Sequence, residues 1–168
     1  MSVCVSTATA RDLRALVALR AEVAEAMKGL HGPGPWSELP SAARVRRQLR
    51  ATTVLVAREG ERLLGTVRLL PANQALFDFS FFTPAACALY VIGLAVSPAC
   101  RGRGVARALM ESAKAAARKW PADALWLDTY DGAVGAAGFY EKCGFRRVGL
   151  TTRDGAGLVF YEWRVNPP

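Results

Sequence analysis

Histidine is nearly absent from this sequence, and cysteine occurs without the spacings that build metal sites. His31 is the only histidine, which disfavours a histidine metal cluster and a histidine-based catalytic triad. The four cysteines form no Cys-x-x-Cys pair; they are Cys4, Cys87, Cys100 and Cys143. Because no signal peptide is recognisable either, we expect free thiols in a reducing, cytoplasmic compartment and no bound metal.

Charge is missing from the 22 residues from Phe79 through Cys100, a length that would allow a membrane-spanning helix. Pro84, Gly93 and Pro98 interrupt this stretch, and its second half is rich in β-branched residues. A buried strand fits that composition better than a membrane helix. We therefore expect no membrane insertion.

The sequence also lacks the composition of a disordered protein. Its 168 residues are 52% hydrophobic and 21% charged, so we expect a single domain over residues 1–168. The formal net charge of +8 suits either an anionic ligand or an arginine-rich surface. A nucleic-acid-binding module is a further interpretation, but no helix-turn-helix, zinc-finger or RNA-binding signature is present, and we expect no nucleic acid partner.

One stretch points to a ligand. The apolar run from Tyr90 to Val96 has the composition of a strand, Ser97-Pro98 ends it, and apolar residues at helical spacing begin at Val105. Between strand and helix lies the basic, glycine-rich turn Arg101-Gly102-Arg103-Gly104. Because a helix N-terminus offers unpaired N–H groups and a partial positive charge, this turn should hold a phosphate or pyrophosphate.

Two common phosphate-binding loops do not match this turn. A nucleotide P-loop needs a lysine followed by a hydroxyl residue, and a Rossmann turn needs a third glycine where this chain has Arg107. The run Arg101-Gly102-Arg103-Gly104-Val105-Ala106 instead resembles the acetyl-CoA signature of the GNAT superfamily of N-acetyltransferases. A second block, Gly138 to Phe145, resembles the Phe-Tyr-x-Lys-x-Gly-Phe segment of the same family.

The resemblance implies an α/β (α+β) fold, with a mixed, mostly antiparallel twisted sheet of six to seven strands flanked by about four helices. Residue patterns predict strands at 2–8, 53–58, 63–70, 90–96, 124–129, 145–150 and 158–165. They predict helices over 13–27, 39–50 and 134–143 and from 105 onward, with a capping box at Thr9–Asp12. Residues 29–35 are predicted to form a loop.

The same resemblance implies roles for particular residues. Acetyl-CoA would be the cosubstrate, its pantetheine arm running beside Leu94-Ala95-Val96 like an added strand, where N–H groups would polarise the thioester carbonyl. Its pyrophosphate would rest on the N–H groups of residues 101–106, with side-chain contacts from Arg101 and Arg103. Tyr140, in the second block, would protonate the leaving thiolate as a general acid. The alternative for Tyr140 is an aromatic residue that packs in the core.

Neither motif marks the general base that must take a proton from the attacking amine. Asp128, late in a predicted strand and facing opposite to Leu127, is the first candidate. Glu22, Glu38 and His31 are weaker candidates. For each of these residues the alternative is an ordinary structural or surface role.

The sequence departs from the family pattern at Ala133, where many members have an asparagine seven residues before the tyrosine. That loss motivates an alternative function, a non-catalytic acyl-CoA-binding or regulatory domain of the same fold, whereas the retained Tyr140 favours an enzyme. Cys143 has no neighbour in sequence that would activate it as a nucleophile. We therefore predict direct acetyl transfer to a primary amine within a ternary complex.

The acceptor is not specified by either motif. A basic protein suits a polycation poorly, which favours amino acids, other neutral or acidic small amines, or a protein segment as the acceptor. Residues 76–82 contain four phenylalanines, which we expect to pack on the core or against a second subunit, since homodimers are common among relatives. The alternative is that they form one wall of the acceptor pocket.

Overall fold

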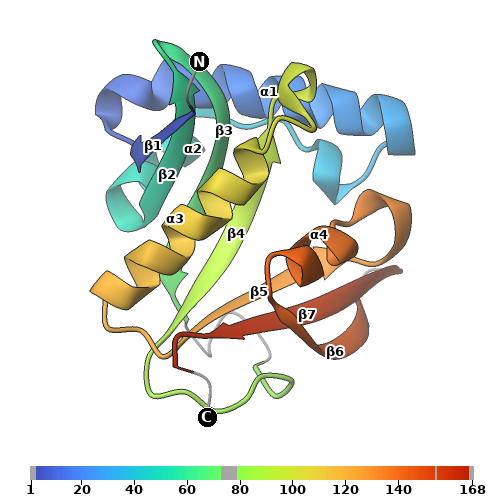
Figure 1. Ribbon diagram of the computed structural model, residues 1–168. Coiled ribbons are helices and arrows are strands. Elements are labelled where there is room, and N and C mark those ends of the chain that lie inside the picture. Colours follow the sequence, from blue (N-terminus) through green and yellow to red (C-terminus); the bar gives the residue numbers. More distant parts are fainter. Residues whose placement is uncertain (1–2, 73–78, 154, 167–168) are drawn as a thin grey trace. The chain divides into compact units, whose positions relative to one another are not determined.

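The computed structural model describes residues 3–72, 79–153 and 155–166, and within these ranges the chain forms seven strands and four α-helices (Figure 1). The strands make one sheet in the order β1-β2-β3-β4-β5-β7-β6. Where the register of a strand pair is defined, the pair is antiparallel except for β4 with β5, which is parallel. The predicted fold class is confirmed.

The order of elements along the chain is the one predicted from the sequence. The strands are β1 Cys4–Thr7, β2 Thr53–Glu59, β3 Arg62–Pro71, β4 Ala88–Val96, β5 Ala124–Tyr130, β6 Arg146–Arg153 and β7 Ala156–Arg164. The α-helices are α1 Leu13–His31, α2 Ala42–Ala51, α3 Val105–Lys119 and α4 Ala137–Lys142. Short 3-10 helices cover Ala10–Asp12, Pro35–Ser37, Pro98–Cys100 and Gly132–Val134.

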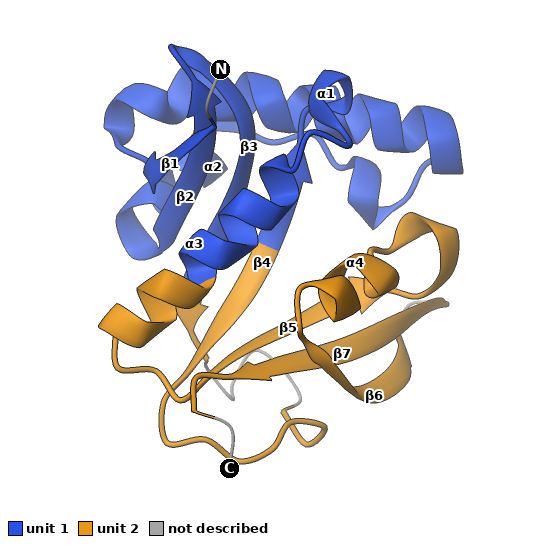
Figure 2. Cartoon of the chain, in the orientation of Figure 1, with its two compact units in different colours: residues 1–69, 93–113 blue, residues 70–92, 114–168 orange. Residues whose placement is uncertain are grey.

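The chain divides into two compact units, shown in different colours in Figure 2. The first unit comprises Met1–Leu69 and Gly93–Ala113, and the second comprises Leu70–Ile92 and Lys114–Pro168. The first therefore holds α1, α2 and the carboxyl-terminal half of β4, and the second holds α4 and the amino-terminal half of β4.

In the first unit, α1 and α2 pack on one face of the strands β2 and β3. The buried cluster there combines Leu16 and Leu19 of α1 with Val45 of α2 and Val54 and Val56 of β2. The helical spacing of the apolar residues explains why each helix buries one face. At the start, the predicted capping box is present: the Thr9 N–H donates to an Asp12 carboxylate oxygen at 2.7 Å.

In the same unit, the start of α3 packs closely against β3 at Gly65. A Cβ on Gly65 would lie 3.0 Å from the Val105 side chain, 3.1 Å from Leu109 and 2.9 Å from the Ala95 carbonyl oxygen. Distances this short leave no room for a side chain. Glycine at this position therefore allows α3 and β4 to approach the strand.

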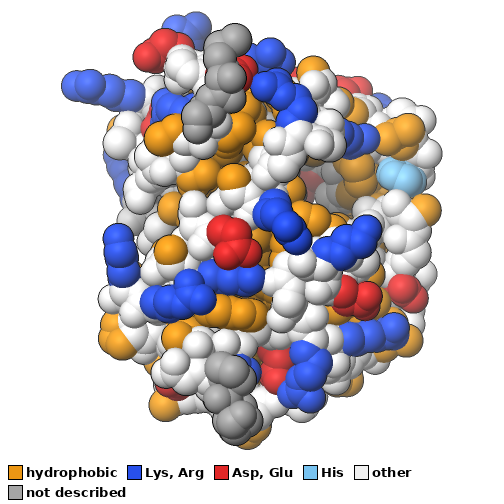
Figure 3. Space-filling model, viewed as in Figure 1, with side chains coloured by type: hydrophobic (Ala, Val, Ile, Leu, Met, Phe, Trp, Pro, Cys, Tyr) orange, Lys and Arg blue, Asp and Glu red, His pale blue; other side chains and the backbone are white. Residues whose placement is uncertain are grey.

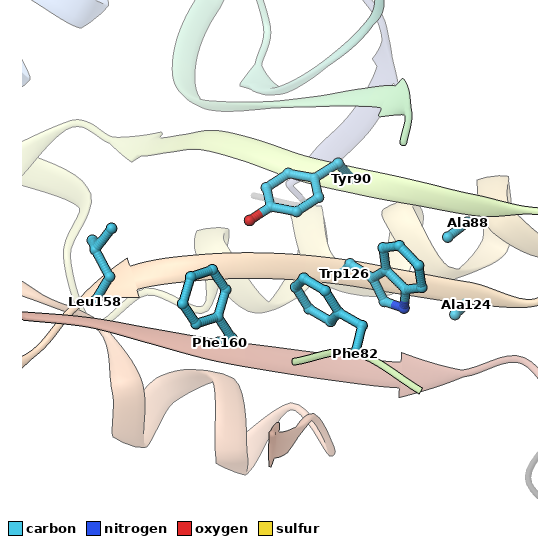
Figure 4. Close-up of a cluster of buried hydrophobic side chains, with 7 residues drawn as sticks. All are labelled: Phe82, Ala88, Tyr90, Ala124, Trp126, Leu158 and Phe160. Atoms are coloured by element: carbon cyan, nitrogen blue, oxygen red, sulfur yellow. The ribbon is translucent and has the colours of Figure 1, made fainter. Parts of the chain in front are cut away.

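The core of the second unit is aromatic and includes part of the phenylalanine-rich segment. Phe82 stacks on Trp126 with ring centroids 4.5 Å apart, and Phe81 stacks on Phe160 at 4.8 Å. Phe79 lies 5.3 Å from Trp126, and Figure 4 shows Tyr90 and Trp126 projecting towards the same cluster. The three described phenylalanines thus pack on the core as expected, while residues 76–78 lie outside the described residues.

A buried carboxylate ties this segment to the sheet. Glu162 of β7 is 1% exposed and accepts hydrogen bonds from the Thr83 N–H at 2.9 Å, the Thr83 hydroxyl at 2.8 Å and the Arg146 guanidinium. Burial opposes ionisation of Glu162, but these donors outweigh it and hold its pKa below the ordinary value.

We expect Glu162→Gln to reduce the free energy of unfolding by about 1–3 kcal/mol at pH 7, because charge-assisted hydrogen bonds are lost. A carboxyl group whose pKa is lower in the folded state than in the unfolded state stabilises the fold at pH values above the unfolded-state pKa. That stabilisation is lost as the pH falls through the folded-state pKa. The difference in the free energy of unfolding between Glu162→Gln and the wild type should therefore shrink below about pH 4.5. Urea unfolding at pH 7 and pH 3.5 measures this, and an equal difference at both pH values would contradict it.

Three predicted helix boundaries are wrong; one is the start of α2, which begins at Ala42 and not at residue 39. Residues 29–31 belong to α1, which ends at His31; the next residue, Gly32, has a φ of +76° and donates its N–H to the Lys28 carbonyl, which closes the helix. Near the other end of the chain, residues 134–136 are not α-helical, and α4 begins at Ala137. A Cβ on Gly135 would lie 1.5 Å from the Tyr130 carbonyl oxygen, so the chain here folds back on β5 instead of extending the helix.

The surface carries the excess positive charge without gathering it into one patch on the face shown. In Figure 3 the Lys and Arg side chains are spread across that face among acidic and apolar groups. The arginines of α2 are exposed: Arg44, Arg46, Arg47 and Arg50. Within the described ranges, no helix combines the length and the apolar character needed to cross a membrane.

Candidate functional site

The glycine-rich turn has the backbone geometry of an anion cradle. Gly102 and Gly104 adopt φ values of +76° and +78°, a region that disfavours residues with a side chain. A Cβ at either position would meet nothing within 4 Å, so the turn is open above both glycines. Among the described residues, their N–H groups donate to no backbone carbonyl, whereas the Arg103 N–H bonds to the Cys100 carbonyl at 3.3 Å.

The two arginines of the turn are exposed and lie against neighbouring elements of the first unit. Arg103 forms an ion pair with Glu59 at 3.3 Å and approaches the Cys100 sulfur at 3.7 Å. Arg101 approaches the Met27 sulfur of α1 at 3.9 Å. Since exposed ion pairs contribute little to stability, both side chains are free to exchange these contacts for a ligand.

The turn is held in place by contacts with α1 and β3. Ser97, 1% exposed, donates its hydroxyl hydrogen bond to Glu22 of α1 at 2.9 Å, and its N–H bonds to the Leu64 carbonyl at 2.9 Å. Three residues after Ser97, the side chain of Cys100 is also buried, at 1% exposed. Glu22, a candidate base from the sequence, therefore acts in this structure as an acceptor that fixes the start of the turn.

The strand segment Leu94-Ala95-Val96 leads directly into this turn. It is partly exposed, whereas the preceding residues 88–91 of β4 are buried. The defined pairs between β4 and β5 end at Tyr90 with Trp126, although β4 continues to Val96. Residues 94–96 thus lie beyond the last defined pair, as a strand segment that receives an added partner must.

Tyr140 lies in α4 of the second unit and is 7% exposed. Its ring contacts Phe139, Phe145 and Tyr161 at centroid distances of 5.3, 6.0 and 6.1 Å. Burial raises the pKa of the phenol well above its ordinary value, and the negative charges of Asp128 and Cys143 raise it further. The hydroxyl is therefore protonated at neutral pH, as a proton donor must be.

A buried lysine fixes the end of the helix that carries Tyr140. Lys114 of α3 is 7% exposed and donates to the Cys143 carbonyl oxygen at 2.6 Å. Its ammonium also lies 5.9 Å from the Phe145 ring centroid and 5.4 Å from that of Trp163. A cation at a helix C-terminus is favourable. Neither motif in the sequence singled out Lys114.

Asp128 is partly exposed in β5 and accepts a hydrogen bond from the Tyr90 hydroxyl at 2.5 Å. Leu127, beside it, is fully buried and pairs with Tyr161, the ring that contacts Tyr140. Because neighbouring side chains of a strand alternate between faces, Asp128 and Tyr140 lie on opposite faces of the sheet in this unit. The predicted orientation of Asp128 is confirmed, and its role as base stays a prediction.

The remaining base candidates lie in the first unit. Glu38 is exposed and paired with Arg44 at 2.9 Å, and His31 is the last residue of α1. Neither contacts the glycine-rich turn through any hydrogen bond of the described residues. In the part of the chain that the structure describes, no three side chains of His, Cys, Asp or Glu are grouped so that they could hold a metal ion.

The sequence matches the family model described as Acetyltransferase (GNAT) family over residues 18–145. The chain belongs to this family. The match includes both blocks from which the resemblance was inferred, the turn at 101–106 and the segment around Tyr140. A search of curated protein sequences finds no match.

Solved structures resemble this GNAT acetyltransferase along its whole length. An N-acetyltransferase from Staphylococcus aureus Mu50 has a TM-score of 0.74 at 16% identity, covering 99% of this chain and 100% of that one. yncA from Salmonella typhimurium, solved with its cofactor acetyl-CoA, has a TM-score of 0.73 at 17% identity, with coverages of 99% and 95%. The paia N-acetyltransferase from Thermoplasma acidophilum, in complex with coenzyme A, has a TM-score of 0.73 at 16% identity, covering 98% of this chain and 99% of that one.

The departure of this GNAT acetyltransferase from the family pattern, Ala133, lies in the 3-10 turn Gly132–Val134 and is exposed. Asp131 caps this turn by accepting from the Gly132 N–H at 3.0 Å. A little further on, the Thr129 hydroxyl oxygen accepts from the Ala136 N–H at 3.0 Å. The loop is thus ordered by local hydrogen bonds that need no asparagine at position 133.

The structure brings together two arginines that neither motif identified. Arg20 of α1 and Arg68 of β3 are both partly buried, and each has a buried nitrogen without a hydrogen-bond partner, Nη2 of Arg20 and Nε of Arg68. Arg20 was visible in the sequence as the only charged member of the apolar stripe Leu13, Leu16, Val17, Ala24 and Met27. The charge of Arg20 on this inward-facing stripe was the signal by which the sequence could have identified it.

Proposed function

We propose that this GNAT acetyltransferase is an N-acetyltransferase, which moves an acetyl group from acetyl-CoA to a primary amine by direct attack in a ternary complex. The observation that carries the proposal is the turn at residues 101–106. Its two glycines have positive φ values, its glycine N–H groups have no backbone acceptor among the described residues, and the space above it is open. These features fit the pyrophosphate of acetyl-CoA.

The roles of the other residues follow from the chemistry of the transfer. Acetyl-CoA supplies the acetyl group as a thioester. The N–H groups of Leu94-Ala95-Val96 would orient the pantetheine arm and polarise the carbonyl. Tyr140, whose phenol is buried and protonated, would donate its proton to the sulfur that leaves when the carbon–sulfur bond breaks. Asp128 lies on the face of the sheet opposite Tyr140, so the amine would approach from that face and give its proton to Asp128 as the carbon–nitrogen bond forms.

We expect acetyl-CoA to stabilise the protein against thermal unfolding. At about 100 times its dissociation constant, a ligand that binds only the native state adds about 2.7 kcal/mol. Arg101→Ala/Arg103→Ala should weaken this stabilisation, because two guanidinium contacts with the phosphates are lost. The matched control is Arg46→Ala/Arg47→Ala, which removes the same charge from exposed positions of α2.

The control pair separates a specific contact from general electrostatics. If only Arg101→Ala/Arg103→Ala loses stabilisation by acetyl-CoA, the turn is supported as the cofactor site. An equal loss in both variants would attribute the effect to the net charge of the protein. Absence of any stabilisation of the wild type at millimolar acetyl-CoA would sink the proposed function. Acetyl-CoA binding without thiol release for any amine would instead favour the non-catalytic acyl-CoA-binding domain that Ala133 motivates.

A further inference from the structure

A pair of arginines in the first unit lacks the anion that would neutralise it. Arg20 donates from Nη1 to the Gln48 side-chain oxygen at 2.5 Å, and this is its only hydrogen bond among the described residues. Arg68 makes none, and neither arginine forms an ion pair with a described carboxylate. By contrast Arg58, which also has a buried unbonded nitrogen, is paired with Asp12 at 3.1 Å.

The register of the sheet places both arginines on one face. Arg68 of β3 lies directly opposite Val54 of β2, so the two side chains share a face. Val54 packs in the cluster formed with Leu16 of α1 and Val45 of α2. Arg68 therefore projects towards α1 and α2, where Arg20 follows Leu16 by one helical turn.

These two positive charges are costly where they lie. Burial, together with the positive charges of Arg68 and Arg44, lowers the pKa of Arg20 to about 10. Burial likewise lowers the pKa of Arg68, with Arg44 adding to the effect. Of these three arginines, Arg44 alone has a carboxylate partner among the described residues, Glu38. An uncompensated charge in such a place is destabilising, and an arriving anion would remove much of the penalty.

Arg68 lies beside the strand segment assigned to acetyl-CoA. The Nε atom of Arg68 would be 3.7 Å from a Cβ on Gly93, a residue of β4 with a φ of +68°. Gly93 directly precedes Leu94-Ala95-Val96. Because Gly93 has no side chain, no Cβ atom contacts the Arg68 guanidinium at this position of β4. An anion held by Arg68 would thus lie one residue from the segment that binds the thioester arm.

We propose that Arg20 and Arg68 bind the carboxylate of the acceptor, and that the acceptor is a small amine that also carries a carboxylate, as an α-amino acid does. Guanidinium groups match the two oxygens of a carboxylate through paired N–H donors. The overall positive charge of the protein favours the same class of acceptor over a polyamine. This inference rests on the proposed N-acetyltransferase activity.

The test compares acceptors that differ only in the carboxylate. A panel of L-amino acids, each paired with its own amide, is assayed for acetyl transfer by thiol release and product mass. The wild type should prefer acids by kcat/KM. Arg68→Met should lower the acid-to-amide ratio by at least about 30-fold, since one partner of a desolvated charge contact is removed. Arg68→Lys should recover part of the ratio, and Arg46→Met, on the exposed face of α2, should leave it unchanged.

A second readout distinguishes a binding role from a structural one. An arginine needed for folding would lower the melting temperature of the ligand-free protein when replaced, whereas removal of an unneutralised, partly buried charge should leave it equal or higher. A large drop in the melting temperature of Arg68→Met would overturn the inference. So would preference for amides, or preference for O-phosphoethanolamine, an amine that carries phosphate.

Acetyl-CoA binding keeps the two proposals apart. Thermal stabilisation by acetyl-CoA should be the same in the wild type, Arg68→Met and Arg46→Met, because none of these changes touches the glycine-rich turn. If that stabilisation is present but the carboxylate preference is missing, the inference about the acceptor fails alone. If acetyl-CoA binds none of the three proteins, the proposed function fails and the inference fails with it.

Discussion

Replacement of Tyr140 by phenylalanine should lower kcat by about 100-fold or more while leaving the affinity for acetyl-CoA nearly unchanged. General acid catalysis contributes about 10²–10⁴-fold, and the variant removes only the hydroxyl. The ring is 7% exposed and packed among Phe139, Phe145 and Tyr161, so the shape of the core is kept. No hydrogen bond between described residues involves the hydroxyl, which limits the cost to folding.

Tyr161→Phe is the matched control for this prediction. Tyr161 is fully buried in the second unit, and its hydroxyl donates to Glu141 at 2.9 Å. This control removes one phenol from the same aromatic group and should reduce stability by about 1 kcal/mol without a large change in kcat. Single-turnover rates and acetyl-CoA titrations measure both effects. Equal kcat values for Tyr140→Phe and the wild type would exclude Tyr140 as the acid.

The fold was predictable because local patterns agree with the global arrangement. Alternation and β-branching located the strands, and the capping box at Thr9 marked the start of the first helix. Predicted helix boundaries were wrong near glycines, because glycine occurs inside helices, at helix ends and at points of close approach. Gly29 is tolerated inside α1, where a Cβ would meet nothing within 4 Å, whereas Gly32 ends the helix. Gly135 is a point of close approach to Tyr130, which no spacing rule reveals.

The candidate site was predictable only where chemistry is carried by a contiguous motif. The turn at 101–106 and the block around Tyr140 are local, so the sequence exposes them. Lys114 bonds to Cys143 from 29 positions away, and Arg20 meets Gln48 across 28 positions. Such groupings depend on which strands and helices become neighbours. A single sequence therefore identifies the residues as unusual, as with Arg20 on an apolar stripe, without identifying their partners.

The glycines of the turn allow a sharp test of the backbone geometry. We expect Gly102→Ala/Gly104→Ala to weaken acetyl-CoA binding on the order of 100-fold, about 2.8 kcal/mol. Alanine strains the left-handed backbone, so the turn relaxes and its N–H groups no longer converge, and each methyl group occupies space that the phosphates need. The strain costs roughly 1–2 kcal/mol for each position, which a domain of ordinary stability tolerates. Isothermal titration with acetyl-CoA measures the change.

The chain offers a control in which the same strain is placed elsewhere. Gly32 and Gly155 have φ values of +76° and +78°, equal to those of Gly102 and Gly104, and a Cβ at each would also meet nothing within 4 Å. Gly32 also has a ψ of −179°, a region almost restricted to glycine, so Gly32→Ala/Gly155→Ala should lose at least as much stability in urea and still keep full affinity for acetyl-CoA. If both double variants lose the same affinity, weakened folding explains the effect and the turn has no special role. A loss confined to Gly102 and Gly104 ties the affinity to their N–H groups, because the control variant also places alanine at two open positions with positive φ.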